Sequence, residues 1–176
     1  MKLTEDIQLD YLPVFPANRN MAIGCIGSGF IMADCHLVAY RNNGFNPVAI
    51  ASRQRSKSQA VAERHHIKKV YDTYHDLLRD EEIEILDIAV PPNLLRDIIR
   101  EAVKQNGHIK GILAQKPMGR NYAEAKEIVQ LCDDAGIVLA VNQNMRYDQS
   151  IRACKSLLDQ QIFGRPVFAS IDMRAI

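Results

Sequence analysis

The sequence predicts an α/β fold built on a doubly wound, mainly parallel sheet with helices on both faces. Two observations predict it. Short apolar runs rich in valine and isoleucine alternate along the chain with longer amphipathic stretches, which are typical of helices. The runs are apolar throughout rather than at every second residue, as expected for parallel strands that are buried on both faces.

Five apolar runs are expected to form the strands of this sheet. They are MAIGCIG (21–27), NPVAIAS (46–52), EILDIAV (84–90), IKGILAQ (109–115) and GIVLAVNQ (136–143). Between them we expect helices at roughly 30–42, 54–66, 93–106 and 121–135, with a short one near 74–80. Strand and helix therefore follow each other from residue 21 onward.

Two of these helices carry local start and stop signals. Asn121 precedes a segment whose early residues are acidic, and Gly136 follows it. Asn93 follows two prolines and opens a segment that Gly107 closes. An asparagine can cap the first free amides of a helix, and early acidic residues match the helix dipole. A glycine accepts the left-handed conformation that ends many helices.

The chain is expected to divide into three regions. Residues 1–20 contain two prolines and little periodicity, and we expect an N-terminal arm that is ordered only if it packs on another segment. Residues 21–147 hold the alternating strands and helices. Residues 148–176 contain one further helical segment, followed by FGRPVFASIDMRAI, which we expect to cross over into the first strand of another domain.

Composition and charge argue against several classes of protein. Hydrophobic residues make up 47% of the 176 residues and charged residues 24%, as in ordinary globular proteins. The formal net charge of +1 gives no reason to expect nucleic acid or an anionic membrane as a partner. No apolar run approaches the length that spans a membrane, and the acidic residues near the start are untypical of a signal peptide.

The cysteines indicate the compartment. Cys25, Cys35, Cys132 and Cys154 lie far apart in the sequence and form no CxxC pair. We expect reduced, mostly buried thiols in a cytoplasmic protein, and we expect no metal site.

The first chemical motif is GCIGSGFIM, residues 24–32. Gly27 and Gly29 match the first two glycines of GxGxxG, between the first strand and the first helix. Gly27 would allow the tight turn, and Gly29 would remove a side chain where a pyrophosphate approaches the backbone. The amides of Phe30 and Ile31 would then point at the phosphate. Met32 takes the third glycine position, and an ordinary strand–helix turn is the alternative.

The second motif follows the second strand, in IASRQRSKS (50–58). Dinucleotide-binding folds usually place a carboxylate here to hold the ribose 2′-hydroxyl of NAD. This sequence instead has Ser52 and Arg53, with Arg55 and Lys57 beyond. A hydroxyl and a guanidinium would bind a 2′-phosphate, so NADP is favoured over NAD. For Arg55 and Lys57 the alternative is a solvated, basic start of a helix.

The third motif is ILAQKPMG, residues 112–119, where an apolar run ends in Lys116 and Pro117. Ligands of open parallel sheets bind beyond the carboxyl ends of the strands, which is where Lys116 is expected. A proline disfavours helical geometry in the residue before it, which helps to fix the direction of Lys116. If partly desolvated, this lysine could act on a substrate hydroxyl. A lysine that merely leaves a strand end for solvent is the alternative.

Taken together, these motifs resemble the glucose–fructose oxidoreductase, inositol dehydrogenase and rhizopine-catabolism family (Gfo/Idh/MocA). Its Glu-Lys-Pro hallmark resembles QKP (115–117), and its glycine loop resembles GSGFIMADCH, which includes His36. VPPN (90–93) stands where the family has a Thr-Pro-Asn-like segment. NQNMRY (142–147) is similar to the family's loop after the fifth strand. The resemblance runs from about residue 21 to the end.

The resemblance implies a chemistry and a set of site residues. Family members exchange hydride between a sugar or cyclitol carbinol carbon and the nicotinamide of NAD or NADP. Lys116 would be the catalytic residue that hydrogen-bonds the reacting oxygen, and Arg146 would face the substrate or support the site. The residues assigned to the cofactor by motif or resemblance are Gly27, Ser28, Gly29, Phe30, Ile31, Ser52, Arg53, Lys57, Ala89, Val90, Pro91, Pro92, Asn93, Gln115, Lys116 and Asn144.

Three departures from the family bear on activity. Gln115 replaces the usual glutamate, and Arg96 stands where many members have a histidine. The family's C-terminal α+β domain, which normally supplies further substrate-binding and acid–base residues, has no counterpart here. We therefore expect this polypeptide alone to show weak or no turnover of a sugar or polyol, and we leave open both a shortened origin and association into a homo-oligomer.

Two classes of function remain. The first is an NADP- or NAD-dependent oxidoreductase, which the glycine loop and Lys116 favour. The second is a non-catalytic dinucleotide-binding module or sensor, which Gln115 and the missing domain favour for this chain. A folded relic that binds no cofactor is a third alternative, and cofactor titration distinguishes it from the other two.

Overall fold

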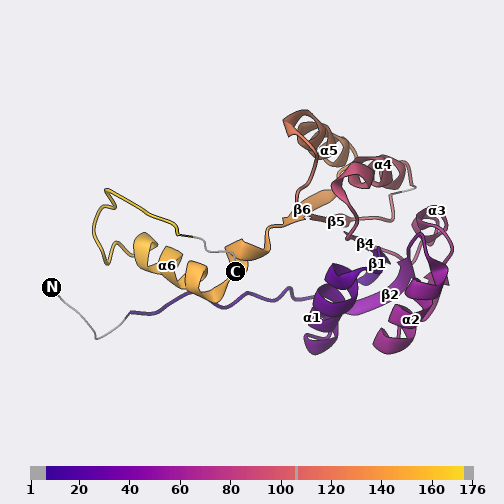
Figure 1. Cartoon of the computed structure of the whole chain (residues 1–176), viewed down its shortest axis with the longest axis horizontal. Coiled ribbons are helices and arrows are strands. Elements are labelled where there is room, and N and C mark those ends of the chain that lie inside the picture. The colour runs from indigo at the N-terminus through magenta and orange to yellow at the C-terminus, as the bar shows by residue number, and fades with distance from the viewer. Residues whose placement is uncertain (1–6, 106, 173–176) are drawn as a thin grey trace. The chain divides into compact units, whose positions relative to one another are not determined.

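A computed structural model of the chain describes residues 7–105 and 107–172. The chain divides into two compact units (Figure 1). The larger unit is Pro16–Asn142, and the smaller unit combines Met1–Phe15 with Gln143–Ile176.

The larger unit contains a six-stranded parallel sheet with the strand order β3-β2-β1-β4-β5-β6. Its strands are β1 (Ala22–Ile26), β2 (Asn46–Ala51), β3 (Lys69–Tyr71), β4 (Ile85–Ile88), β5 (Gly111–Gln115) and β6 (Val138–Asn142). The predicted doubly wound sheet is confirmed, and each of the five predicted runs contains a strand. The strand β3 was not predicted, because a three-residue strand has too few residues to show a pattern.

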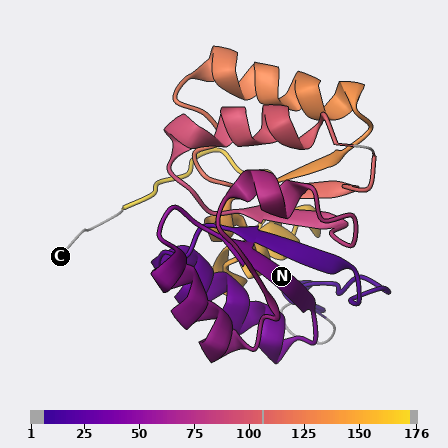
Figure 2. The ribbon, with the colours of Figure 1, turned by 90° about the vertical axis from the view of Figure 1, so that its right-hand side faces the viewer.

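Helices cover the sheet on two sides (Figure 2). The helical elements of this unit are η1 (Ile31–His36), α1 (Leu37–Asn42), α2 (Arg55–His65), α3 (Tyr74–Leu78), α4 (Pro92–Ala102) and α5 (Tyr122–Asp134). Apolar residues of η1, α1 and α2 pack with Ile23, Cys25 and Ile50 in one core. Those of α3, α4 and α5 pack with Ile26, Leu86 and Ile112 in a second core. The two cores correspond to the two faces of the sheet.

The helix boundaries follow local chemistry, with one correction. Asn121 caps α5 as predicted, because its side chain accepts a hydrogen bond from Glu124 N at 3.0 Å. The predicted cap at Asn93 is wrong, because α4 already begins at Pro92 and no side chain caps it. Proline suits the first turn of a helix, where its missing N–H has no partner to lose and its fixed φ is already helical.

The smaller unit contains η2 (Asn144–Tyr147) and α6 (Gln149–Asp159). The N-terminal arm packs on α6, because Asp10 N donates to Ser156 Oγ at 3.1 Å and Gln160 Nε2 donates to Gln8 O at 2.8 Å. The strand expected after Gly164 is wrong for residues 165–172, and the last four residues of that segment lie outside the described residues. A strand needs a hydrogen-bonding neighbour, and no other described segment pairs its backbone with 165–172.

Candidate functional site

The carboxyl ends of the strands bring the predicted motifs to one edge of the sheet. Ile26 at the end of β1 is in register with Ala51 of β2 and with Ile88 of β4. Ile88 is in turn in register with Ala114 of β5. Neighbouring strands lie about 4.8 Å apart, so the tips of β1 and β5 are separated by about 10 Å. The glycine loop after β1 and Lys116 after β5 therefore border the same edge.

Gly27 occupies a position that only glycine fits. Its φ of +114° is a conformation that other residues avoid, and a Cβ there would lie 2.3 Å from Ala89 O. Gly27 N donates to Ala51 O at 2.8 Å, and Ala89 N donates to Ile26 O at 2.9 Å. The turn is thus pressed between β2 and β4, where the order of the strands reverses and ligands of such sheets bind.

Gly29 is the open position of the same loop. A Cβ built on Gly29 would meet no protein atom within 4 Å. Phe30 and Ile31 follow it at the start of the first helix, and both are exposed. The first amides of a helix have no intrahelical partner, so this loop can accept a phosphate. The helix opens with the π-helical stretch η1, in which Met32 is fully buried.

The tip of β2 carries linked hydroxyls and a basic helix start. Ser52 Oγ lies 2.8 Å from Ser28 Oγ, and Arg53 after it is exposed. Arg55 forms an ion pair with Asp72, whereas Lys57 is exposed. Neither Arg53 nor Lys57 has an ion-pair partner among the residues that the structure describes.

The segment after β4 lies at the same edge and leads into α4. Ala89 and Val90 are half-buried, and Val90 packs against the larger core. Pro91 is exposed, Pro92 opens the helix, and Asn93 is exposed in its first turn. This segment therefore lies between the glycine loop and the tip of β5.

The tip of β5 differs from expectation in one respect. Gln115 is half-buried, and its Oε1 accepts a hydrogen bond from Lys116 N at 2.8 Å. The bond between Lys116 and Pro117 is cis. Lys116 is exposed rather than partly desolvated. The residues that follow it, 117–121, are also exposed or only half-buried.

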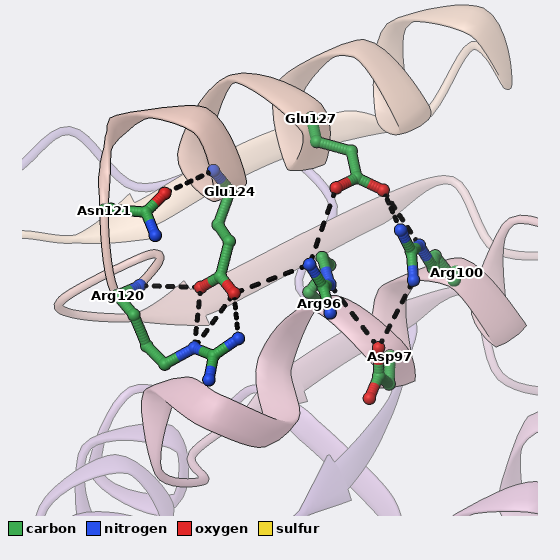
Figure 3. A network of polar contacts seen from close by, with 7 residues as sticks. All are labelled: Arg96, Asp97, Arg100, Arg120, Asn121, Glu124 and Glu127. Atoms are coloured by element: carbon green, nitrogen blue, oxygen red, sulfur yellow. Dashed lines mark hydrogen bonds and ion pairs between the residues drawn. The ribbon is translucent and has the colours of Figure 1, made fainter.

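A network of charged side chains fixes the segment that follows Lys116 (Figure 3). Glu124 of α5 is only 6% exposed, and it accepts from Arg120 N at 2.9 Å and from Arg120 Nε at 2.9 Å. The hydrogen bonds from Arg120 lower the pKa of Glu124 to about 2. Arg96 of α4 lies 3.5 Å from Glu124, and Arg100 Nε donates to Glu127 at 2.9 Å. The network joins α4, α5 and the Lys116 segment.

A buried polar cluster lies on the other face of the sheet. His36 Nδ1 lies 2.8 Å from Asp87 Oδ2, and Tyr40 OH donates to the same oxygen at 2.7 Å. Asn142 Nδ2 donates to His36 Nε2 at 2.7 Å. Burial, followed by the nearby Asp87 carboxylate, raises the pKa of Tyr40 and of Cys25. This cluster joins the first helix to β4 and β6, and the sequence did not indicate it.

Two of the predicted site residues lie outside the larger unit. Asn144 and Arg146 belong to the smaller unit, where both are exposed. Of the four free cysteines, Cys25 and Cys132 are buried but Cys35 and Cys154 are exposed, so the expected burial holds for two. The described residues contain no group of three or more side chains suited to a metal ion. Within that part of the chain, every helix is too short or too polar to cross a membrane.

Comparison with known families and proteins gives consistent matches. A family model described as "Oxidoreductase family, NAD-binding Rossmann fold" matches residues 21–143. D-apiose dehydrogenase from Paraburkholderia graminis is 28% identical over 151 residues, which are 85% of this chain and 39% of that protein.

Two solved structures have the same fold. An oxidoreductase from Agrobacterium radiobacter, in complex with NAD⁺, L-tartaric acid and magnesium, has a TM-score of 0.77 at 26% identity and matches 84% of this chain and 42% of its own. The myo-inositol dehydrogenase from Lactobacillus casei, in complex with NAD(H) and myo-inositol, has a TM-score of 0.73 at 28% identity. The match covers 84% of this chain and 43% of that protein. The chain thus spans about two fifths of the length of these proteins.

Proposed function

The chain belongs to the Gfo/Idh/MocA oxidoreductase family, and from this premise we propose that its larger unit binds a nicotinamide dinucleotide for hydride transfer. One observation carries the proposal. Gly27 is packed so closely against Ala89 O that no side chain fits, while two residues later Gly29 faces open space. A tight turn followed by an unobstructed amide-rich loop matches the shape that a pyrophosphate needs.

The bound cofactor would exchange a hydride with the carbinol carbon of a sugar or cyclitol. We assign the chain's own residues as follows. The glycine loop holds the pyrophosphate, residues 89–93 line the nicotinamide side, and the ammonium of Lys116 donates to the reacting oxygen. The Arg120–Glu124 contacts hold the segment behind Lys116 and so position its backbone. The dehydrogenases of apiose and inositol among the similar proteins support this substrate class.

We also propose that NADP is preferred over NAD. The start of α2 has no acidic residue in its first turn and no side-chain cap, yet Arg55 and Lys57 lie there. Cations at the N-terminal end of a helix interact unfavourably with the helix dipole, and a bound anion would offset this interaction. Arg53 and Lys57 are exposed and supply the cations that a 2′-phosphate requires.

A second function is favoured by the tip of β5. Gln115 stands where the family has a glutamate and uses its side chain to bind Lys116 N, and the ammonium of Lys116 is exposed. Both features are compatible with a dinucleotide-binding module that does not catalyse hydride transfer. We therefore propose that this polypeptide alone binds the cofactor in the cytoplasm but turns over sugars or polyols weakly or not at all.

Calorimetric titration of the full chain with NADP⁺ and NAD⁺ tests the binding. Gly29→Val should abolish measurable binding without unfolding the chain, because a Cβ at this position meets no protein atom within 4 Å and the added side chain would fill the space of the pyrophosphate. Ala135→Val, at the exposed C-cap of α5, is the matched control. Equal affinity of wild type and Gly29→Val, or no binding by wild type, would contradict the proposal.

Steady-state reduction of NADP⁺ by a panel of sugars and inositols separates the two functions. The expected result is cofactor binding without measurable turnover by this polypeptide. Turnover of any polyol with a kcat of about 1 s⁻¹ or more, as in ordinary enzymes, would show that the chain is an enzyme by itself and would refute the weak or absent turnover proposed here.

A further inference from the structure

Three serine hydroxyls form a hydrogen-bonded chain at the predicted adenosine end of the site. Ser52 at the tip of β2 is its centre. Its Oγ lies 2.8 Å from Ser28 Oγ of the glycine loop, 2.6 Å from Ser58 Oγ of α2 and 3.2 Å from Gln54 O. Ser58 is fully buried, and the other two serines are half-buried.

By distance alone, either hydroxyl could donate between Ser52 and Ser58, and we assign the donors of this chain by counting protons. A serine hydroxyl has one proton to donate and two lone pairs that accept. The proton of Ser52 is donated to Gln54 O, the N-cap carbonyl of α2. Ser58 and Ser28 must then both donate to Ser52 Oγ, which uses both of its lone pairs. With this assignment, Ser52 Oγ uses its proton and both lone pairs within the protein.

The same count leaves Ser28 as an acceptor. Its only proton is donated to Ser52, so toward the site its Oγ can offer lone pairs alone. Ser28 lies between Gly27 and the open Gly29, beside the tip of β2. This is the region in which doubly wound sheets hold the adenosine ribose. A ribose hydroxyl can donate to such an oxygen, whereas an ionised phosphate cannot.

We infer that Ser28, and not Ser52, meets the cofactor, by accepting a hydrogen bond from an adenosine ribose hydroxyl, and that Ser52 and Ser58 are positioning residues that impose this polarity. The inference rests on the proposed binding of a nicotinamide dinucleotide. It reverses the simplest interpretation of the sequence, in which Ser52 donates to a 2′-phosphate. Any preference for NADP then depends on Arg53 and Lys57, and the serine chain opposes it.

The two interpretations predict opposite effects of Ser52→Ala. Without Ser52, the hydroxyl of Ser28 loses its internal acceptor and can turn to donate to a phosphate. The affinity for NADP⁺ relative to NAD⁺ should then rise by about 2- to 10-fold, the worth of one neutral hydrogen bond. If Ser52 itself donates to the 2′-phosphate, the same substitution lowers that ratio.

Calorimetric titration of the full chain with both cofactors measures the ratio. Ser28→Ala should weaken NAD⁺ binding by about 2- to 10-fold, because it removes the acceptor. Ser52→Thr, which keeps the hydroxyl, should retain the wild-type ratio. Ser56→Ala, at an exposed serine of the same helix, is the matched control. Thermal unfolding of each variant identifies any that fail to fold. If Ser52→Ala is among them, the effect of Ser28→Ala on NAD⁺ binding tests the inference independently.

The outcomes distinguish this inference from the proposed function. Wild type that binds neither cofactor refutes the proposed function and this inference with it. Wild type that binds, with a Ser52→Ala ratio that is unchanged or lower, overturns the serine polarity alone. A raised ratio together with weakened NAD⁺ binding by Ser28→Ala supports it.

Discussion

At the scale of single residues, Gly27 combines two constraints that can be measured. Its φ of +114° and its approach to Ala89 O both exclude a side chain. Gly27→Ala should therefore lower the free energy of unfolding by about 2–4 kcal/mol, since strain and a steric clash add. Gly29→Ala, which meets no atom within 4 Å, should change it by less than about 0.5 kcal/mol. Urea denaturation measures both, and equal losses would contradict this account of the loop.

Glu124 gives a residue-scale prediction for pH dependence. The Arg120 contacts lower its pKa in the folded chain to about 2, from 4.5. The carboxylate therefore stabilises the fold fully above about pH 4.5, and this contribution is lost as the pH falls toward 2. In Glu124→Gln, the free energy of unfolding should fall less steeply over that range than in wild type. Identical profiles would contradict the network, and the exposed Glu81→Gln is the control.

Residue patterns predicted part of the site and missed its tertiary contacts. Gly27 and Lys116 could be placed because their local sequences specify a turn and a strand end. The role of Glu124 could not, because it depends on Arg120 folding back onto α5. Ser58 was missed for the same reason, since a serine within a helix gives no sign that Ser52 lies against it.

At the scale of elements, the strands were predictable because each buried run is apolar over its whole length. The strand β3 could not be predicted in this way, because Lys69 and Tyr71 at its ends are polar and interrupt any apolar run. Both side chains donate hydrogen bonds to Asp80. The start of α4 was predicted too late in the sequence. Asn93 was predicted to be the cap, although Pro92 already lies in the first turn of the helix. Capping residues predict that a helix begins nearby, but packing decides at which residue.

The start of α2 yields an element-scale prediction. Arg53→Ala and Lys57→Ala should each weaken NADP⁺ binding by about 3- to 10-fold and leave NAD⁺ binding nearly unchanged, because only NADP carries the 2′-phosphate. Arg55→Ala is the matched control, since Arg55 is already paired with Asp72. Calorimetric titration at low and high salt measures these effects. Equal losses for both cofactors would show that the two cations do not contact the 2′-phosphate.

At the scale of the whole molecule, the alternation of strands and helices was sufficient to predict the doubly wound sheet. The order of its strands brings four separate segments of the chain to one edge, which no single motif could indicate. The arm was predicted to need a packing partner, and its contacts with α6 in the smaller unit provide one. A strand beyond Gly164 was wrongly predicted within the described residues, because an apolar segment without a neighbouring strand cannot form a sheet.

The most direct test of the central claim is NMR chemical-shift mapping of NADP⁺ on the isotope-labelled chain. The account predicts shifts for the amides of 27–31, 52–53, 89–90 and 115–116, which lie on one edge of the sheet although they are distant in sequence. It would be contradicted by shifts confined to the groove between α5 and β6, which Val129 and Leu139 line, or by no shifts at saturating cofactor.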